Sequence, residues 1–187
     1  MNSIWQMWER GVTPTLCNRI VEECERLQPM EANVGSDSTT NTVNTNVRRS
    51  EVRWAGQIDW INKLVYDFAS RANRQAFGFN ISYLEDIQYT IYKGTDEGYY
   101  DWHHDTFWGG HTAFDRKLSL IIQLSDPSEY EGGQFLLADE YEQPDPKALS
   151  QRGTVFCFPS PVRHTVKPVT SGVRKSLVAW IEGPKFK

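Results

Sequence analysis

A group of residues that could bind iron stands out in this sequence. His103, His104 and Asp105 are consecutive, His164 follows later in the chain, and Arg174 comes soon after it. Two histidines and one carboxylate form the ligand set that holds non-heme Fe(II) while leaving coordination positions open for a co-substrate and oxygen. A basic side chain near such a metal suits an acidic co-substrate, because a guanidinium binds a carboxylate through two hydrogen bonds.

The local sequence indicates which of the neighbouring residues would bind the metal. If residues 99–105 form a strand, their side chains alternate between its two faces. His103 and Asp105 then point to the same side, and His104 points to the other. The predicted ligand set is therefore His103, Asp105 and His164.

A His-x-Asp triplet is weak evidence alone, because such triplets arise by chance and often lie on solvated loops. Here the segment 98–100 (Gly-Tyr-Tyr) leads directly into the triplet, and His164 follows the turn at 159–161 (Pro-Ser-Pro). Arg174 could pair with an acidic side chain at the surface, as most arginines do. We expect it instead across a tight turn from His164, where it would form a buried anion site.

The composition narrows the class of protein. A length of 187 residues fits one domain, residues 1–187. The net charge of −4 gives no basic field, so nucleic acid is not the expected partner. No run of about 18 apolar residues is present, so a membrane span is not expected. The absence of a signal-like segment and of closely spaced cysteines favours a cytoplasmic or otherwise soluble intracellular protein; the oligomeric state stays open.

The elements that would position these residues fall into two parts. A helix is expected from Pro14, because proline suits the first turn, and a second helix from Asp59 to near Gly78. Between them, the polar stretch 35–46 is expected to be a loop, with a possible place over the site, and residues 48–54 a strand. This helical, substrate-side part covers residues 1–80.

Residues 81–187 change to a period of two. Expected strands cover 84–91, 118–124, 134–138 and 154–158, and the final pair is 164–169 and 174–181, joined by a turn at 170–172. Two helices followed by about eight short strands predict an α+β fold, a sandwich or jelly roll with helices packed on it. Closure of such strands would bring distant metal ligands together.

The segment 88–180 resembles the iron and 2-oxoglutarate-dependent dioxygenases, specifically their prolyl 4-hydroxylase-like, PKHD-type branch. The matching pieces are YKGTDEGYYDWHHD, RKLSLIIQLSDPSEYEGGQFLL and GTVFCFPSPVRHTVKPVTSGVRKSLVAWIEGP. In the N-terminal part, Arg49-Ser50-x-x-x-Trp54 resembles a strand on the substrate side of that branch. The resemblance implies a double-stranded β-helix (jelly roll) core, with the N-terminal helices packed on its major sheet.

The same resemblance implies cofactors and the residues that bind them. Fe(II) would be held by His103, Asp105 and His164. The co-substrate 2-oxoglutarate would place its distal carboxylate on Arg174, with hydrogen bonds from Tyr92 and Gln123. Val178 stands where some relatives have threonine, which leaves more of the anion binding to Arg174 and Tyr92. Oxygen is the second co-substrate, and ascorbate would support the reaction.

The implied activity is hydroxylation of a peptide or protein, with proline as the expected target residue. The expected substrate-side residues are Arg49, Trp54, Tyr99, Trp102 and Trp108. Arg48 and Arg116 are expected to be solvated charges, and His111 an exposed residue that does not bind metal. The same chemistry on a free amino acid, another small molecule or a nucleobase is the alternative. A non-catalytic metal-binding jelly roll is a further alternative, against which Arg174 argues, since a structural metal has no need of it.

Overall fold

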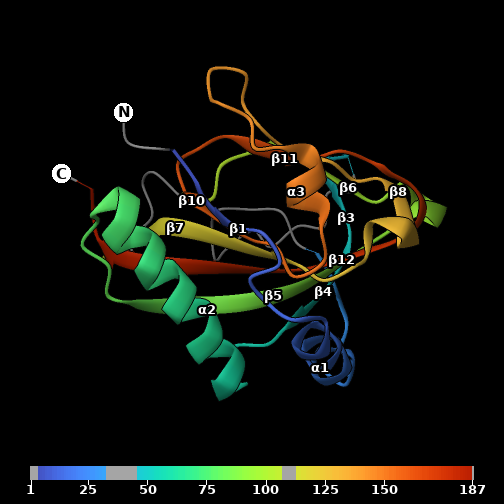
Figure 1. Cartoon of the computed structure of the whole chain (residues 1–187), viewed down its shortest axis with the longest axis horizontal. Helices are drawn as coiled ribbons and strands as arrows, with labels where there is room; N and C mark the ends of the chain where they lie inside the picture. The colour runs from blue at the N-terminus through green and yellow to red at the C-terminus, as the bar shows by residue number, and fades with distance from the viewer. Residues whose placement is uncertain (1–3, 33–45, 107–112, 187) are drawn as a thin grey trace.

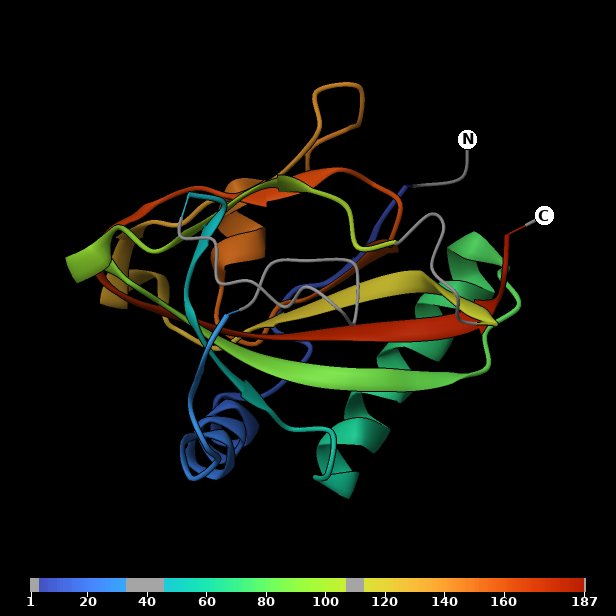
Figure 2. The same cartoon turned by 180° about the vertical axis from the view of Figure 1, so that it is seen from behind.

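The computed structural model describes residues 4–32, 46–106 and 113–186, which form three layers (Figure 1). One face of a large sheet carries helices α1 and α2, and a smaller sheet lies across the other face (Figures 1 and 2). The large sheet has the order β1 (Gln6–Trp8), β10 (Val155–Pro159), β7 (Phe114–Gln123), β12 (Val169–Pro184), β5 (Tyr83–Lys93), β4 (Glu51–Trp54) and β2 (Met30–Glu31), and β8 (Tyr130–Gly132) also pairs with β12. The smaller sheet has the order β3 (Arg48–Arg49), β6 (Tyr99–His103), β11 (His164–Val166) and β9 (Phe135–Leu137).

The two helices supply the apolar side chains that cover the large sheet. In α1 (Pro14–Glu25), Pro14 occupies the first turn and the Thr13 hydroxyl accepts a hydrogen bond from the Leu16 N–H at 3.3 Å. The helix α2 (Asp59–Ala72) lies against β5, β7, β10 and β12. A π-helical turn, Asn73–Phe77, follows it and ends at Gly78 in the left-handed conformation. A short helix, α3 (Pro146–Ser150), was not predicted from the sequence.

Alternation along β7 divides the interior into two cores. Leu118, Leu120 and Ile122 pack into the core beneath the helices, whereas Ile121 belongs to the core between the two sheets. Ser119 and Gln123 share the face of Ile121, so polar groups reach the space between the sheets. The expected α+β jelly roll with its N-terminal helices on the larger sheet is confirmed.

The predicted strand 48–54 is in fact divided at Ser50. Its first part, β3, pairs with β6 in the smaller sheet, and its second part, β4, pairs with β5 in the larger one. The chain therefore crosses from one layer to the other at this point. Apart from Asn46, the expected loop at 35–46 lies outside the described residues.

The predicted hairpin formed by 164–169 and 174–181 is wrong. The strand β11 pairs with β6 and β9, whereas β12 pairs with β5, β7 and β8 in the other sheet. Gly172 lies inside β12 at a φ of 69°, and a Cβ there would be 2.0 Å from the Glu129 carbonyl oxygen. This glycine permits close contact with β8 rather than a turn.

Candidate metal centre

His103, Asp105 and His164 converge in the space between the sheets. Their candidate ligand atoms all lie within 4.8 Å of one another. The carboxylate oxygens of Asp105 are 3.7 Å from His103 Nε2 and 3.6 Å from His164 Nε2. His103 ends β6 and faces His164, which begins β11, so pairing of these strands brings the two imidazoles together. His104 is exposed and takes no part in the group, as the alternation predicts.

Both imidazoles are fixed in the tautomer that a metal requires. His103 Nδ1 lies 2.7 Å from the Asp101 carbonyl oxygen, and His164 Nδ1 lies 2.8 Å from that of Val162. Because a carbonyl oxygen only accepts, each Nδ1 carries the hydrogen of a neutral ring. The lone pair is then on Nε2, the atom that points toward Asp105. The donor set therefore fits a divalent metal with open coordination positions.

Asp105 lies in the loop that follows β6, because that strand ends at His103. Its backbone N–H donates to the Ser160 carbonyl oxygen at 2.9 Å. Its carboxylate accepts a hydrogen bond from the Ser119 hydroxyl at 2.6 Å, and this hydroxyl also lies 3.0 Å from that of Ser160. The prediction that 99–105 forms one strand is wrong beyond His103, although Asp105 still faces the two histidines.

The electrostatics of the group favour the protonation states that bind metal. Burial, together with the nearby His164, lowers the pKa of His103 to about 3, so its imidazole is neutral near pH 7. Burial opposes ionisation of Asp105, but electrostatic attraction to the His164 and His103 imidazoles, together with Arg116 and the hydrogen bond from Ser119, lowers the pKa of that carboxyl. A neutral imidazole and an ionised carboxylate are the forms that coordinate a metal ion.

An aromatic shell surrounds the two histidines. The Tyr100 ring stacks on His103 with centroids 3.4 Å apart, and the rings of Phe158 and Phe135 lie 4.8 Å and 5.4 Å from His164. Simple alternation would put Tyr100 on the opposite face from His103. An irregularity in the pairing of β6 with β11 shifts the register between these two residues and puts both on the same side.

The triad and its aromatic shell line a cavity of about 30 Å³, the triad cavity. Trp180, only 6% exposed, also lines it, and its buried indole N–H has no hydrogen-bond partner within the described part of the chain. The Arg116 guanidinium lies 4.0 Å from the Trp180 ring and pairs with Glu85. The prediction of Arg116 as a merely solvated charge is therefore wrong.

Arg174 lies beside a second cavity of about 290 Å³, the Arg174 cavity. Its side chain is buried, sits opposite Tyr92 across β12 and β5, and packs at 5.6 Å over the Tyr92 ring. Among the described residues, no hydrogen bond or ion pair satisfies its guanidinium. Gln123 also lines this cavity, and its amide donates to the Tyr130 hydroxyl at 2.8 Å. Phe135 lines both this cavity and the triad cavity.

A family model described as the 2OG-Fe(II) oxygenase superfamily matches residues 87–182, which is more than half of the chain. The chain belongs to this oxygenase superfamily. The superfamily is defined by Fe(II), 2-oxoglutarate and oxygen, and the triad of this oxygenase has the donor set that such a cofactor needs.

Relatives of the oxygenase include PKHD-type hydroxylases. The one from Synechococcus is 39% identical over 83 residues, which are 44% of this chain and 36% of the relative. The one from Prochlorococcus marinus is 45% identical over 65 residues, or 35% of this chain and 28% of the relative. The chain thus spans about a third of the length of these curated relatives.

Solved structures share the fold over nearly the whole oxygenase. A Pseudomonas putida prolyl-4-hydroxylase gives a TM-score of 0.69 at 19% identity, covering 98% of this chain and 94% of that one. A Trichoplax adhaerens prolyl hydroxylase, in complex with a fragment of the hypoxia inducible factor oxygen degradation domain, gives 0.72 at 16% identity, covering 96% and 83%. Within the described ranges of the oxygenase, no helix is both long and apolar enough to cross a membrane.

The residues predicted for the substrate side are scattered. The Trp54 ring is 6.2 Å from that of Trp180, which places it next to the triad cavity. Arg49 packs over Tyr99 and donates to the Asp96 carbonyl oxygen at 3.3 Å, whereas Trp102 packs against Arg163 and Lys167. Trp108 and His111 lie outside the described residues.

Several residues of the oxygenase site were missed in the sequence. Ser119 is the clearest case, because a hydroxyl between Leu118 and Leu120 in a buried strand had to face a polar partner. Trp180 and Phe135 gave no signal beyond being aromatic. Arg48, predicted to be solvated, is buried at 7% exposure and lines the triad cavity.

Proposed function

We propose that this chain is an Fe(II)- and 2-oxoglutarate-dependent hydroxylase that acts on a prolyl residue of a peptide or protein. One observation carries the proposal: the cavity of a buried His-Asp-His group with free Nε2 lone pairs shares Phe135 with the cavity lined by Arg174, a buried cation with no anionic partner among the described residues. Membership of the oxygenase superfamily supplies the cofactors that fit these two features.

In this proposal, His103, Asp105 and His164 would hold the iron and leave coordination positions open for 2-oxoglutarate and oxygen. When bound there, iron, 2-oxoglutarate and O2 would supply the oxidising chemistry, in which one oxygen atom enters succinate as carbon dioxide leaves and the other is inserted into a substrate C–H. The carbonyl groups of Asp101 and Val162 fix the imidazoles, and Ser119 fixes the carboxylate.

Arg174 binds the distal carboxylate of 2-oxoglutarate in this assignment. A guanidinium buried without a counter-charge is costly, and a bidentate carboxylate would offset that cost. Tyr92 beneath the guanidinium and Gln123 beside it supply further polar contacts. The co-substrate would lie against Phe135, since this ring borders both the metal and the Arg174 cavity.

The aromatic side chains have the task of excluding water and positioning the substrate. Tyr100, Phe135 and Phe158 cover the two imidazoles, which protects the reaction from solvent. The unpartnered Trp180 indole N–H is a donor for a substrate carbonyl. A peptide substrate is supported by the Trichoplax adhaerens relative of similar fold, whose structure contains a peptide fragment. We treat residues 1–187 as one domain, because both helices complete the core of the larger sheet.

The test is an anaerobic titration of the Fe(II)-loaded protein with 2-oxoglutarate, followed by the visible charge-transfer band of the chelate. A saturable band is expected, and Arg174→Ala should shift its midpoint to higher concentration, whereas the exposed-arginine control Arg74→Ala should not. Succinate formation with proline-containing peptides, free amino acids and a nucleobase then identifies the substrate class. A folded, iron-loaded protein without a band would refute the proposal.

A further inference from the structure

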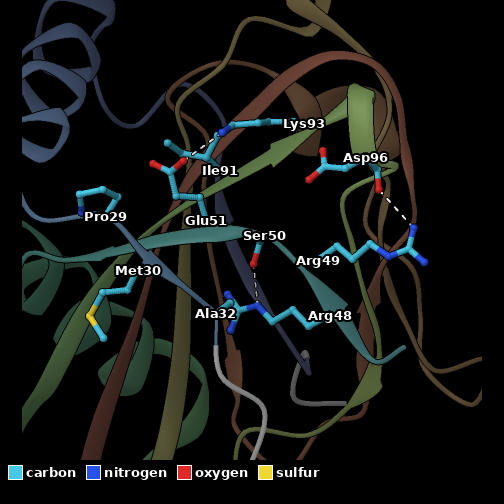
Figure 3. Close-up of a pocket in the computed structure, with 10 residues that line it drawn as sticks. All are labelled: Pro29, Met30, Ala32, Arg48, Arg49, Ser50, Glu51, Ile91, Lys93 and Asp96. Atoms are coloured by element: carbon cyan, nitrogen blue, oxygen red, sulfur yellow. Dashed lines mark hydrogen bonds and ion pairs between the residues drawn. The ribbon is translucent and has the colours of Figure 1, made fainter. Parts of the chain in front are cut away.

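A third cavity, of about 490 Å³, lies where β2, β4 and β5 of the large sheet meet β3 of the smaller one. We call it the Arg48 groove. In Figure 3, Pro29 and Met30 are on one side of it, Arg49 and Asp96 are on the other, and Arg48 and Ser50 lie between them. Its volume is within the range of about 300–1,000 Å³ typical of pockets that hold a ligand of drug size.

Positive charges outnumber negative charges in the lining of this groove by one. Three cations line it, Arg48, Arg49 and Lys93, together with two carboxylates, Glu51 and Asp96. Glu51 is already neutralised, because its carboxylate lies 2.8 Å from the Arg53 guanidinium and 3.0 Å from the Lys93 ammonium. Their hydrogen bonds hold the pKa of Glu51 below its ordinary value.

Arg48 is the residue whose charge has no counterpart. It is 7% exposed, its Nε donates to the Ser50 hydroxyl at 2.8 Å, and its guanidinium lies 4.6 Å from the Tyr100 ring. These contacts fix the orientation of the guanidinium, but neither carries a negative charge. No carboxylate of the described residues pairs with it. A buried guanidinium in this state is a site for an anion.

The groove and the triad cavity are neighbours that share one lining side chain. Arg48 lines both the groove and the triad cavity, and the Tyr100 ring beneath it stacks on His103. A ligand held by Arg48 therefore lies next to the metal ligands. The apolar part of the groove is formed by Pro29, Ile91 and Met30, of which Met30 is 47% exposed.

We infer that the Arg48 groove binds an acidic side chain of the peptide substrate, a few residues from the residue that is oxidised at the metal. The inference rests on the proposed function and names its substrate class, an extended peptide with Asp or Glu beside the target. Charge complementarity carries it, because a segment with one acidic and one apolar side chain matches the arginines and the apolar wall.

Binding of a degenerate peptide library with a fixed central proline tests the groove. Anaerobic protein with Fe(II) and 2-oxoglutarate is incubated with the library, and the retained peptides are sequenced. Asp and Glu should be enriched near the proline. A selected peptide should bind about tenfold more tightly than its Asp→Asn or Glu→Gln counterpart, since hydrogen bonds to a charged group are stronger than neutral ones.

Substitutions of Arg48 and of an arginine outside the groove distinguish a specific contact with Arg48 from a general effect of the protein's net charge. Arg48→Gln should reduce this acid-to-amide ratio to about one, and Arg48→Lys should restore part of it. If Arg48→Gln does not fold, Arg49→Gln, altered at a partly exposed position of the same groove, should still lower the ratio. Arg74→Gln, outside the groove, should leave the ratio intact.

The outcomes distinguish this inference from the proposed function. Absence of the chelate band refutes the oxygenase assignment, whereas the library still reports what the groove selects. A normal band together with no enrichment of acidic residues overturns the inference alone. So does enrichment that persists unchanged in both Arg48→Gln and Arg49→Gln.

Discussion

Two buried arginines line cavities that each share a residue with the triad cavity, and their surroundings differ. Arg174 lies on β12, a central strand that pairs with β5 at this residue and with β7 from Ser176 onward, and a Cβ on Gly133 would approach its Cδ to 2.9 Å. Arg48 lies on β3, a two-residue strand at the edge of the smaller sheet, beside a larger and partly exposed groove. The central strand β12 holds Arg174 rigidly, which suits a small ligand of constant shape such as 2-oxoglutarate. The edge strand β3 leaves Arg48 beside an open groove, which suits a peptide of variable sequence.

Removal of a metal ligand is expected to have the largest effect, because the triad cavity shares Arg48 with the groove and Phe135 with the Arg174 cavity. His103→Ala and Asp105→Ala should each abolish turnover, because two ligands do not retain iron as three do. His104→Ala is the matched control, since that side chain is exposed and outside the group. Succinate formation measures the effect. Retention of peptide selectivity in His103→Ala would show that the Arg48 groove works without the metal.

Removing Arg174 should affect only the co-substrate side. Arg174→Ala is expected to weaken 2-oxoglutarate binding by roughly 2 to 5 kcal/mol, which is about 30-fold to several-thousand-fold. Arg174→Lys should recover part of the loss, because it restores the charge without the bidentate geometry. The half-saturating concentrations of 2-oxoglutarate and peptide are compared. A similar loss for both ligands would contradict the separation of the two sites.

Ser119 tests how firmly the metal centre itself is fixed. Ser119→Ala removes the hydroxyl that donates to the Asp105 carboxylate at 2.6 Å. Loss of such an outer contact typically weakens metal binding by about 10- to 100-fold. Competition with a chelator of known affinity measures it. Ser125→Ala, which removes a buried hydroxyl bonded to the Val173 carbonyl instead, should leave the affinity for iron unchanged.

Acid should lower the free energy of unfolding of the metal-free protein through His103. The pKa of His103 is lowered to about 3 in the folded chain, whereas an unfolded histidine titrates near 6.5. Between these two pH values the unfolded chain binds more protons than the folded chain. The free energy of unfolding therefore decreases as the pH is lowered, by roughly 2 kcal/mol from pH 7.5 to pH 5. Urea denaturation at pH 7.5 and pH 5 checks this. The same pH dependence in His103→Gln would contradict it.

Hydrophobic alternation predicted faces well and strand partners poorly. It correctly separated Leu118 from Ser119, and His103 and Asp105 do converge, although Asp105 lies beyond the end of β6 and the register shift moves Tyr100 to the side of His103. It could not show that the segment 48–54 changes sheets at Ser50, or that β11 and β12 belong to different layers. Periodicity records which side of a strand is buried, whereas the choice of neighbouring strand depends on contacts between distant parts of the chain.

The burial of Arg48 could not be predicted from the sequence either, for the same reason. In the sequence it is one of several arginines in a polar region, and solvation is the ordinary fate of such a side chain. Its burial depends on the crossing at Ser50 and on the Tyr100 ring, which the register shift of β6 turns toward the metal. No local pattern encodes these contacts, so this part of the site emerges only in three dimensions.

The stretch of β12 from Arg174 to Trp180 sets the distance between the two cavities that these residues line. Its pairing with β5 keeps a constant register, so both side chains lie on the same face of the strand. Because a strand rises about 3.3 Å per residue, they are roughly 20 Å apart along it. Deletion of one residue between them would turn one of the two toward the helices. Sequence change here is therefore limited to substitutions.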